Sequence, residues 1–190
     1  GVNYDITDYL NYDKENVLVV RVDATQYEGW FYEGAGIYRH VWLNQSNNLH
    51  IANDGVFSYS KVYGNKATVS VETTVENKNL LSSKGSVITY IFDRDGKRIA
   101  QSTEQAISLN VNAATVVKQS ILVANPHLWS LEDPYLYRVV SIVKQNGKTV
   151  DSTNHRFGIR TIEIKPNGLF VNGTHVKIKG TNNHQDHAGV

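Results

Sequence analysis

The stretch ATVSVETTVEN, residues 67–77, is the part of the chain that decides the fold. Its apolar residues Val69, Val71 and Val75 occupy odd positions, and polar residues fill the even positions between them. Successive side chains of a β-strand point to opposite faces of a sheet, so this alternation predicts a strand with one buried and one hydrated face. A hydrated face is typical of an antiparallel sheet.

Similar runs lie on both sides of this stretch. They are rich in β-branched and aromatic residues, and they cover residues 17–22, 36–43, 55–64, 67–77, 85–93, 115–123, 137–145 and 175–180. Asp95-Gly96 and Asn146-Gly147 lie between paired runs, where a tight hairpin turn needs the positive φ that these dipeptides adopt at low cost. About seven short strands between residues 49 and 158 predict an all-β fold, an immunoglobulin-like β-sandwich.

The core of this sandwich is predicted from the apolar positions of the runs. We expect two sheets that pack face to face, with no long helix between residues 49 and 158. The predicted core residues are Val69, Val71, Ile88, Ile91, Val117, Ile121, Val139 and Ile142. Because the chain has no Cys, the sandwich is of the disulfide-free kind.

Composition excludes several classes of partner. The formal net charge is +1, with 19 Lys and Arg scattered among 18 Asp and Glu, so neither nucleic acid nor an anionic membrane is an expected partner. No apolar stretch approaches the ~20 residues that span a bilayer. The chain also lacks Met, which we interpret as the sign of a piece cut from a longer protein. The compartment stays unknown, with a periplasmic or extracellular location as the hypothesis.

Six segments of the chain resemble glycoside hydrolase family 2, most closely its β-galactosidases. In order they are YDITDYL (4–10), VLVVRVD (17–23), GAGIYRHVWL (34–43), NPHLWSLEDPYLYRV (125–139), HRFGIRTIEI (155–164) and LFVNGTHVKIKGTNNHQDH (169–187). The resemblance implies three parts. Residues 1–48 would be the last strands of a jelly-roll sugar-binding domain, 49–158 the immunoglobulin-like sandwich, and 159–190 a hairpin and the first strand of a TIM barrel.

Proline makes one of these segments rigid. In residues 125–139, Pro126 and Pro134 fix φ and hold the preceding residues extended, which predicts a non-helical strap. The aromatic and apolar side chains of the strap are expected to close one end of the sandwich; they are Trp129, Leu131, Tyr135 and Tyr137. We interpret all four, and Arg39 of the preceding domain, as structural.

The resemblance also implies what the chain does and does not contain. Retaining glycosidases use two carboxylates about 5 Å apart, and the family places both far beyond residue 190, so no catalytic residue is predicted here and the chain alone is expected to be inactive. His184 matches the histidine that contacts the sugar at the end of the first barrel strand. Asn182 and Asp23 are the further candidates for substrate contact, and Asp186 is expected to hold the loop.

A metal site is the weaker interpretation of the same loop. His184, Asp186 and His187 are close in sequence, but their spacing matches no familiar chelating pattern and a further strong ligand is missing. No metal site and no cofactor is therefore predicted within the chain. The resemblance implies that Mg²⁺ or Na⁺ can bind near the active site of the intact enzyme through ligands outside this segment.

Several alternatives stay open at the level of sequence. The predicted function is that of a positioning module in a retaining β-galactosidase whose partners are a galactoside and the rest of its own chain, with oligomer formation left open. β-Glucuronidase and β-mannosidase are the alternative activities. A non-enzymatic carbohydrate-binding or adhesion module is the alternative class, with Tyr27, Trp30 and Tyr32 available to stack on sugar rings.

Overall fold

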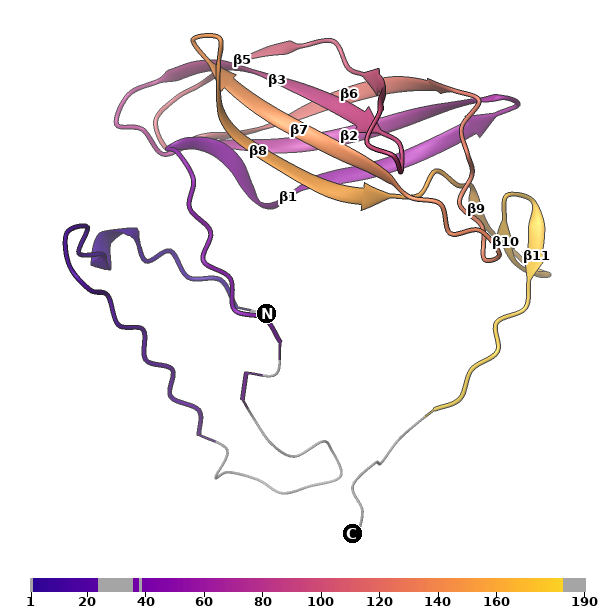
Figure 1. Cartoon of the computed structure of the whole chain (residues 1–190), viewed down its shortest axis with the longest axis horizontal. Helices are drawn as coiled ribbons and strands as arrows, with labels where there is room; N and C mark the ends of the chain where they lie inside the picture. The colour runs from indigo at the N-terminus through magenta and orange to yellow at the C-terminus, as the bar shows by residue number, and fades with distance from the viewer. Residues whose placement is uncertain (1, 24–35, 38, 183–190) are drawn as a thin grey trace, which may run out of the picture. The chain divides into compact units, whose positions relative to one another are not determined.

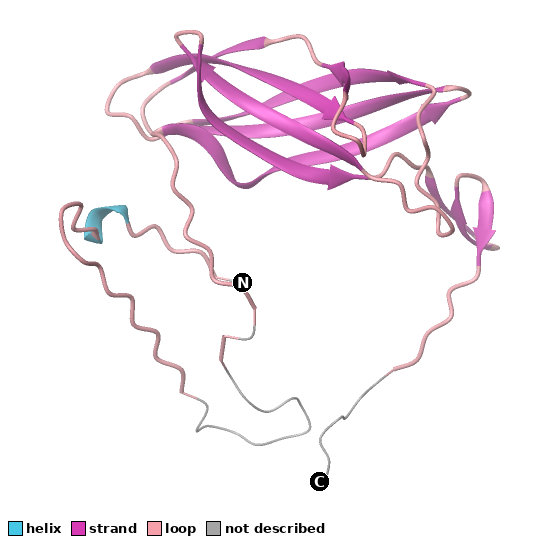
Figure 2. Cartoon of the chain, viewed as in Figure 1, coloured by secondary structure: helices cyan, strands magenta, loops and turns pink. Residues whose placement is uncertain are grey.

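The structure, a computed structural model, describes residues 2–23, 36–37 and 39–182. Asn44–Gly180 form one compact unit, in which a β-sandwich is followed by a small three-stranded sheet (Figures 1 and 2). The sandwich contains β1 (Leu49–Tyr63), β2 (Lys66–Asn77), β3 (Ser83–Phe92), β4 (Arg98–Gln101), β5 (Gln105–Leu109), β6 (Ala114–Ala124), β7 (Tyr137–Gln145) and β8 (Lys148–Phe157). The small sheet contains β9 (Ile162–Lys165), β10 (Gly168–Val171) and β11 (Thr174–Val176).

Two antiparallel sheets form the sandwich. The first sheet has the order β1-β2-β6, and the second has the order β4-β3-β7-β8, with β5 also paired to β3. Figure 1 shows these strands as two layers that run along the same long direction. The all-β, immunoglobulin-like sandwich predicted from sequence is confirmed, and its strands span Leu49–Phe157.

Strand β2 lies at the centre of the first sheet because it pairs with β1 on one side and β6 on the other. As predicted from the alternation, Val69, Val71 and Val75 are fully buried. Thr73, at the odd position between Val71 and Val75, is fully buried as well. The inward face of this strand therefore carries a polar residue in the middle of its valine row.

A polar layer divides the interior of the sandwich into two apolar clusters. One cluster includes Val69 and Val139, and the other includes Val75 and Val143. Between them lie four buried polar side chains that hydrogen bond to one another or to the backbone: Thr73, Thr89, Gln119 and Ser141. Because each of these groups loses water on folding, the layer is stable only when its hydrogen bonds are made.

Six of the eight predicted core residues face the interior, and two do not. Ile88 and Ile142 lie opposite each other on β3 and β7, but the inward positions of these strands belong to their neighbours Val87 and Val143. Ile88 is still only 6% exposed, so it is buried on the outer face of the sheet. Their assignment to the inter-sheet core was wrong because both residues stand in runs that are apolar on both faces.

The hairpin turns follow the predicted chemistry in one case and only partly in the other. Asn146 and Gly147 have φ values of 51° and 75°, the two successive positive angles of a type I′ turn. In the β3–β4 connection only Gly96 has positive φ, at 82°. There the Asp93 carboxylate accepts hydrogen bonds from the backbone N–H groups of Asp95 and Lys97 at 3.1 and 2.8 Å.

The flanking segments are less regular than their sequences predict. Residues 17–22 lie in no strand although they are β-branched and apolar. A strand needs a neighbour that accepts and donates its backbone hydrogen bonds, and high β-propensity alone does not replace one. The predicted strand at 36–43 likewise contains no regular strand at its described residues, and the jelly-roll and barrel assignments of the two flanks stay predictions.

The predicted hairpin after residue 159 is confirmed and extends into a sheet of three strands. β10 pairs with β9 and with β11, both antiparallel. Asn172 and Gly173, with φ values of 51° and 78°, form the tight turn between β10 and β11. Regular strand structure ends at Val176, so residues 177–180 do not continue the strand that the sequence predicted for 175–180.

One half-buried histidine, His155, makes the stability of the sandwich depend on pH. His155 of β8 faces the edge strand β1, where its Nε2 lies 3.0 Å from the Ser58 hydroxyl oxygen. Burial lowers the pKa of the His155 imidazole below its ordinary value. The unfolded chain, in which a histidine has a pKa of about 6.5, therefore takes up a proton before the folded protein does as the pH falls.

We expect the free energy of unfolding to be at its full value above about pH 6.5 and to decrease as the pH falls through the folded pKa of His155. The His155→Gln variant should lack this part of the decrease. Urea titrations of both proteins between about pH 7 and pH 5 measure the difference. A His175→Gln variant is the control, because His175 is exposed on β11; a wild-type slope in the His155→Gln protein would contradict the assignment.

Candidate functional site

The predicted sugar contacts lie near the ends of the described chain. His184, together with Asp186 and His187 of the metal alternative, lies outside the described residues, as do Tyr27, Trp30 and Tyr32. Asn182 is described and exposed. The Asp23 carboxylate is half-exposed, and its Oδ2 lies 3.4 Å from the Arg21 guanidinium.

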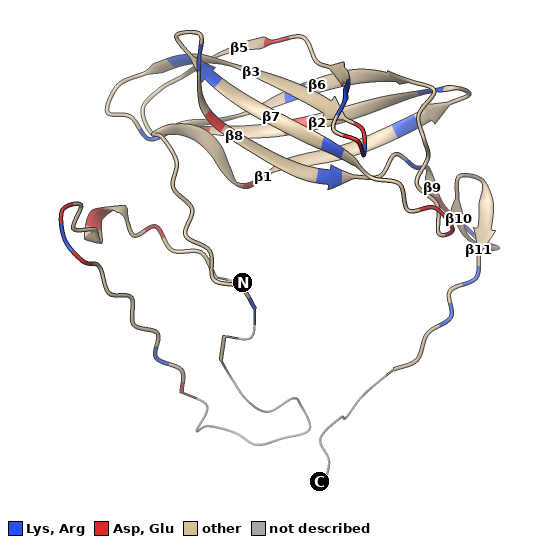
Figure 3. Cartoon of the chain, viewed as in Figure 1, with Lys and Arg blue, Asp and Glu red and all other residues tan. Residues whose placement is uncertain are grey.

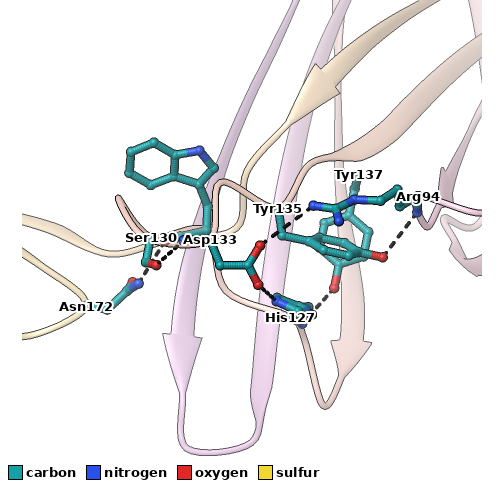
Figure 4. A network of polar contacts seen from close by, with 8 residues as sticks. Arg94, His127, Ser130, Asp133, Tyr135, Tyr137 and Asn172 are labelled. Atoms are coloured by element: carbon teal, nitrogen blue, oxygen red, sulfur yellow. Dashed lines mark hydrogen bonds and ion pairs between the residues drawn. The ribbon is translucent and has the colours of Figure 1, made fainter.

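The best-defined polar constellation lies in the predicted strap. The last three residues of that segment, 137–139, belong to β7, and the name strap is kept below for residues 125–136, which link the two sheets of the sandwich at one end and contain no helix, as predicted. Figure 4 shows side chains of the strap that point toward one another beside the end of the sandwich. Three sets of contacts hold it in place.

The first set surrounds the Asp133 carboxylate (Figure 4). One of its oxygens contacts His127 Nε2, and the other lies 3.7 Å from the Arg94 guanidinium of the β3–β4 loop. The Tyr135 ring stacks on the His127 ring, with 4.1 Å between the two ring centres. The guanidinium carbon of Arg94 lies 4.6 Å from the centre of the same Tyr135 ring. Within the strap, the Ser130 hydroxyl accepts a hydrogen bond from the Asp133 backbone N–H at 3.0 Å.

The second set anchors the strap to the apolar core. The Tyr137 hydroxyl accepts the backbone N–H bond of His127 at 2.7 Å, and burial raises the pKa of the Tyr137 phenol. Leu128 and Tyr135 pack against the core cluster that contains Tyr137. The prediction that Tyr135 and Tyr137 close the sandwich is confirmed. For Leu131 it is wrong, because that side chain is 57% exposed and Leu128 takes the apolar position instead.

The third set joins the strap to the chain that leaves β8. The Trp129 backbone N–H donates to the Ile159 carbonyl oxygen at 2.9 Å. The Trp129 side chain covers Gly158 so closely that a Cβ there would lie 2.9 Å from it. The Arg160 guanidinium lies over the Trp129 ring, 4.9 Å from the ring centre.

Asn172 connects the same place to the small sheet (Figure 4). Its Nδ2 donates to the Trp129 carbonyl oxygen at 2.9 Å, and its Oδ1 accepts the Thr161 N–H bond at 3.0 Å. The Asn172 N–H donates in turn to the Thr161 carbonyl oxygen at 2.9 Å. The sequence around Asn172, an Asn-Gly dipeptide between two short apolar runs, indicates a turn and carries no signal of a side chain that bridges two modules.

The contacts of the strap network are structural ones. The Asp133 carboxylate is engaged by His127 and Arg94 (Figure 4). What the network does is fix the direction in which the chain leaves the sandwich through Gly158, Arg160 and Thr161. Residues 177–182, which precede the predicted sugar-contacting loop, follow from the small sheet that the network holds.

Two further kinds of feature are not found in the part of the chain that the structure describes. Among residues 2–23, 36–37 and 39–182, no group of three or more His, Asp or Glu side chains is arranged to hold a metal ion. Within the same residues, no helix has the length and apolar character needed to cross a membrane.

Comparison with known proteins gives a consistent result. The model of the family "Glycosyl hydrolases family 2" matches residues 49–160, which contain all eight sandwich strands. A β-galactosidase of Bacteroides ovatus is 34% identical over 97% of this chain and 22% of its own length. A β-glucuronidase of Formosa agariphila is 28% identical over 93% of this chain and 20% of its own length.

The fold of the chain is also similar to solved structures. A glycosyl hydrolase family 2 member from Bacteroides cellulosilyticus superimposes with a TM-score of 0.66 at 34% identity, over 71% of this chain and 19% of that one. The chain thus spans about a fifth of the length of the curated relatives that it matches.

Proposed function

The chain belongs to glycosyl hydrolases family 2, and from this we propose that it is the positioning module of a longer retaining β-galactosidase. In this proposal the sandwich, the strap and the small sheet form a rigid support for a catalytic barrel that carries both catalytic carboxylates. The observation that carries the proposal is the junction at Trp129 and Asn172, which fixes the small sheet to the end of the sandwich by backbone and side-chain hydrogen bonds.

A rigid junction has a physical purpose in a glycosidase. Catalytic groups accelerate the reaction only when they are held close to their productive geometry. Residues 177–182 leave the small sheet directly after β11, and the proposed sugar contacts Asn182 and His184 follow at once in the sequence. A support that fixes β9–β11 therefore fixes the point from which the chain continues toward these two residues.

The role proposed for His184 is to donate a hydrogen bond to a sugar hydroxyl. Such a bond strengthens as the ring flattens toward the oxocarbenium-like transition state. Asn182 is proposed as an accessory contact, and Asp23 as a contact from the sugar-binding domain. The exposure of Asn182 and the partial exposure of Asp23 are compatible with these roles.

β-Glucuronidase is the second candidate activity, and a specific finding favours it. The Formosa agariphila relative, named a β-glucuronidase, is 28% identical over 93% of this chain. β-Galactosidase is preferred because the Bacteroides ovatus relative of that name has the higher identity, 34% over 97%.

The experiment is a comparison of the full-length protein with the 190-residue chain on aryl β-galactosides, β-glucuronides and β-mannosides. The full-length protein should hydrolyse the galactoside with the highest kcat/KM and retain the anomeric configuration, which nuclear magnetic resonance of the first product measures. The 190-residue chain should show no hydrolysis above background.

Three other outcomes are possible, and each would contradict one part of the proposal. A higher kcat/KM on the glucuronide would assign the second candidate activity. No hydrolysis of any substrate by the full-length protein would favour a binding module. Hydrolysis by the 190-residue chain that is lost when one of its own carboxylates is replaced would place the catalytic pair inside it.

A further inference from the structure

The outer face of the second sheet carries three arginines in a single row across four strands. Phe92 of β3 lies opposite Arg98 of β4 on one side and Arg138 of β7 on the other. Arg138 in turn lies opposite Arg156 of β8. All three arginines are exposed. With strands about 4.8 Å apart, the row is about 14 Å long; we call Arg98, Arg138 and Arg156 the arginine row.

Aromatic rings hold two of these guanidinium groups on the face. Arg98 lies over the Tyr90 ring at 5.3 Å, and Arg138 lies over the Phe92 ring at 4.7 Å. The guanidinium groups thus cover the two rings. A partner that approaches the outer face of the second sheet therefore meets positively charged guanidinium groups with planar N–H donors, and it does not meet bare aromatic rings.

No carboxylate neutralises the arginine row within the described residues. The ion pairs found in that part of the chain involve other cations, and neither an ion pair nor a hydrogen bond joins the side chains of Arg98, Arg138 or Arg156 to an acidic group there. Arg138 and Arg156 are moreover directly opposite in an antiparallel pair, where like charges destabilise the sheet.

The outer face of the first sheet shows that this imbalance is local. There Lys118 of β6 pairs with Glu72 of β2 at 3.2 Å. His50 and Lys78 both lie within 4 Å of Glu76, at 3.6 and 3.8 Å. On the outer face of the second sheet, Lys144 of β7 also has an acidic partner, Glu104, at 2.8 Å, so the arginine row stands out even on its own face.

The arginine row lies at the end of the sandwich from which the chain continues. Arg138 is the second residue of β7 and follows the strap, and Arg156 is the next-to-last residue of β8. Figure 3 shows Lys or Arg positions side by side near the start of β7 and the end of β8, close to where the chain passes on to β9. The nearby strap carboxylate of Asp133 is already paired with Arg94 and His127.

From these observations we infer that the arginine row docks a carboxylate-bearing surface of the polypeptide that follows the small sheet. The inference rests on the proposed function, in which the chain is part of a longer enzyme. Guanidinium groups bind carboxylates through paired N–H bonds, and a partner that carries two or three Asp or Glu side chains would remove the repulsion between Arg138 and Arg156. The arginine row would then orient the catalytic barrel relative to the sandwich.

The test compares one triple variant in two settings. Arg98→Gln, Arg138→Gln and Arg156→Gln are combined in the full-length protein and in the 190-residue chain. The control combines Lys61→Gln, Lys66→Gln and Lys148→Gln, which removes the same charge from exposed positions elsewhere in the sandwich. In the full-length protein at low salt, the Tm of the arginine variant should fall about 3 to 6 °C below that of the control.

In the 190-residue chain the arginine variant should lose less Tm than in the full-length protein, because removal of the repulsion between Arg138 and Arg156 offsets the loss of the two guanidinium–ring contacts. The difference in the full-length protein should shrink in about 0.5 M salt, which screens exposed charges. Equal Tm values for the arginine and control variants of the full-length protein would overturn the inference, and so would the same loss in both settings.

An anionic polysaccharide is the competing occupant. If wild-type full-length protein binds polygalacturonate and the arginine variant loses this binding without a change in Tm, the surface binds glycans and the inference is wrong. The proposed function is judged separately, by hydrolysis of aryl glycosides with the wild-type protein. An error in the proposed activity and an error in the proposed docking surface are therefore detected separately, the first by hydrolysis and the second by Tm.

Discussion

The Gln119→Ala variant is expected to lose about 3 to 5 kcal/mol of its free energy of unfolding. Gln119 of β6 is 4% exposed. Its Nε2 donates to the carbonyl oxygens of Val87 and Thr103 at 3.0 and 3.1 Å, and its Oε1 accepts the Thr89 hydroxyl bond at 2.7 Å. Alanine would remove one hydrogen-bond partner from each of these three groups and would open a cavity between the sheets.

Urea unfolding of the 190-residue chain measures this loss. Gln101→Ala is the matched control, since Gln101 is exposed on β4, and its change should stay within about 0.5 kcal/mol. Gln119→Leu separates the two causes: it fills most of the volume but makes none of the hydrogen bonds, so it should still cost about 2 kcal/mol or more. A cost as small as that of the control would show that the polar layer does not stabilise the sandwich.

This polar layer also explains why the fold could be predicted while part of the core could not. Alternation alone located Val69, Val71 and Val75 correctly. In the runs around Ile88 and Ile142, apolar residues occupy both faces, so the period of two does not say which face is buried.

What decides the face in those runs is pairing between strands that are far apart in sequence. Thr89 bonds to Gln119, 30 residues away, and lies 3.1 Å from the Ser141 hydroxyl, 52 residues away. These three side chains must face the interior to satisfy one another. That requirement turns Ile88 and Ile142 to the outer face. Sequence alone shows the residues but not their partners.

The strap shows the same division. Its rigidity followed from Pro126 and Pro134, whose effect on the backbone is local. The bridge from Asn172 to the Trp129 carbonyl spans 43 residues, and nothing in the neighbourhood of Asn172 predicts it. The exposure of Leu131 was missed for a related reason, because the apolar position beside the core is filled by Leu128.

The predicted sugar contacts rest on the sequence rather than on the structure. His184 was assigned from its resemblance to the family pattern and lies outside the described residues. What the structure adds lies earlier in the chain: the sandwich holds the strap, and Asn172 ties the strap to the turn that precedes β11. The assignment of His184 can be decided by kinetics.

In the full-length enzyme, His184→Ala is expected to lower kcat/KM by at least ~10²-fold. A donor that bonds best to a sugar hydroxyl in the transition state contributes on the order of 3 kcal/mol to catalysis, and alanine removes it. The measurement is the kcat/KM for an aryl β-galactoside, made beside the Tm of each protein. Because the bond strengthens toward the transition state, kcat should fall more than KM rises.

His175→Ala is the matched control, because His175 is an exposed histidine on β11, nine positions before His184. It should keep kcat/KM within about twofold, since a side chain that contacts no substrate does not change the transition-state free energy. A wild-type kcat/KM for His184→Ala would make that residue a surface group. A loss of activity that matches a loss of folded protein would make it structural. Only a large fall in kcat at unchanged Tm fits a histidine that holds the sugar as the glycosidic bond breaks.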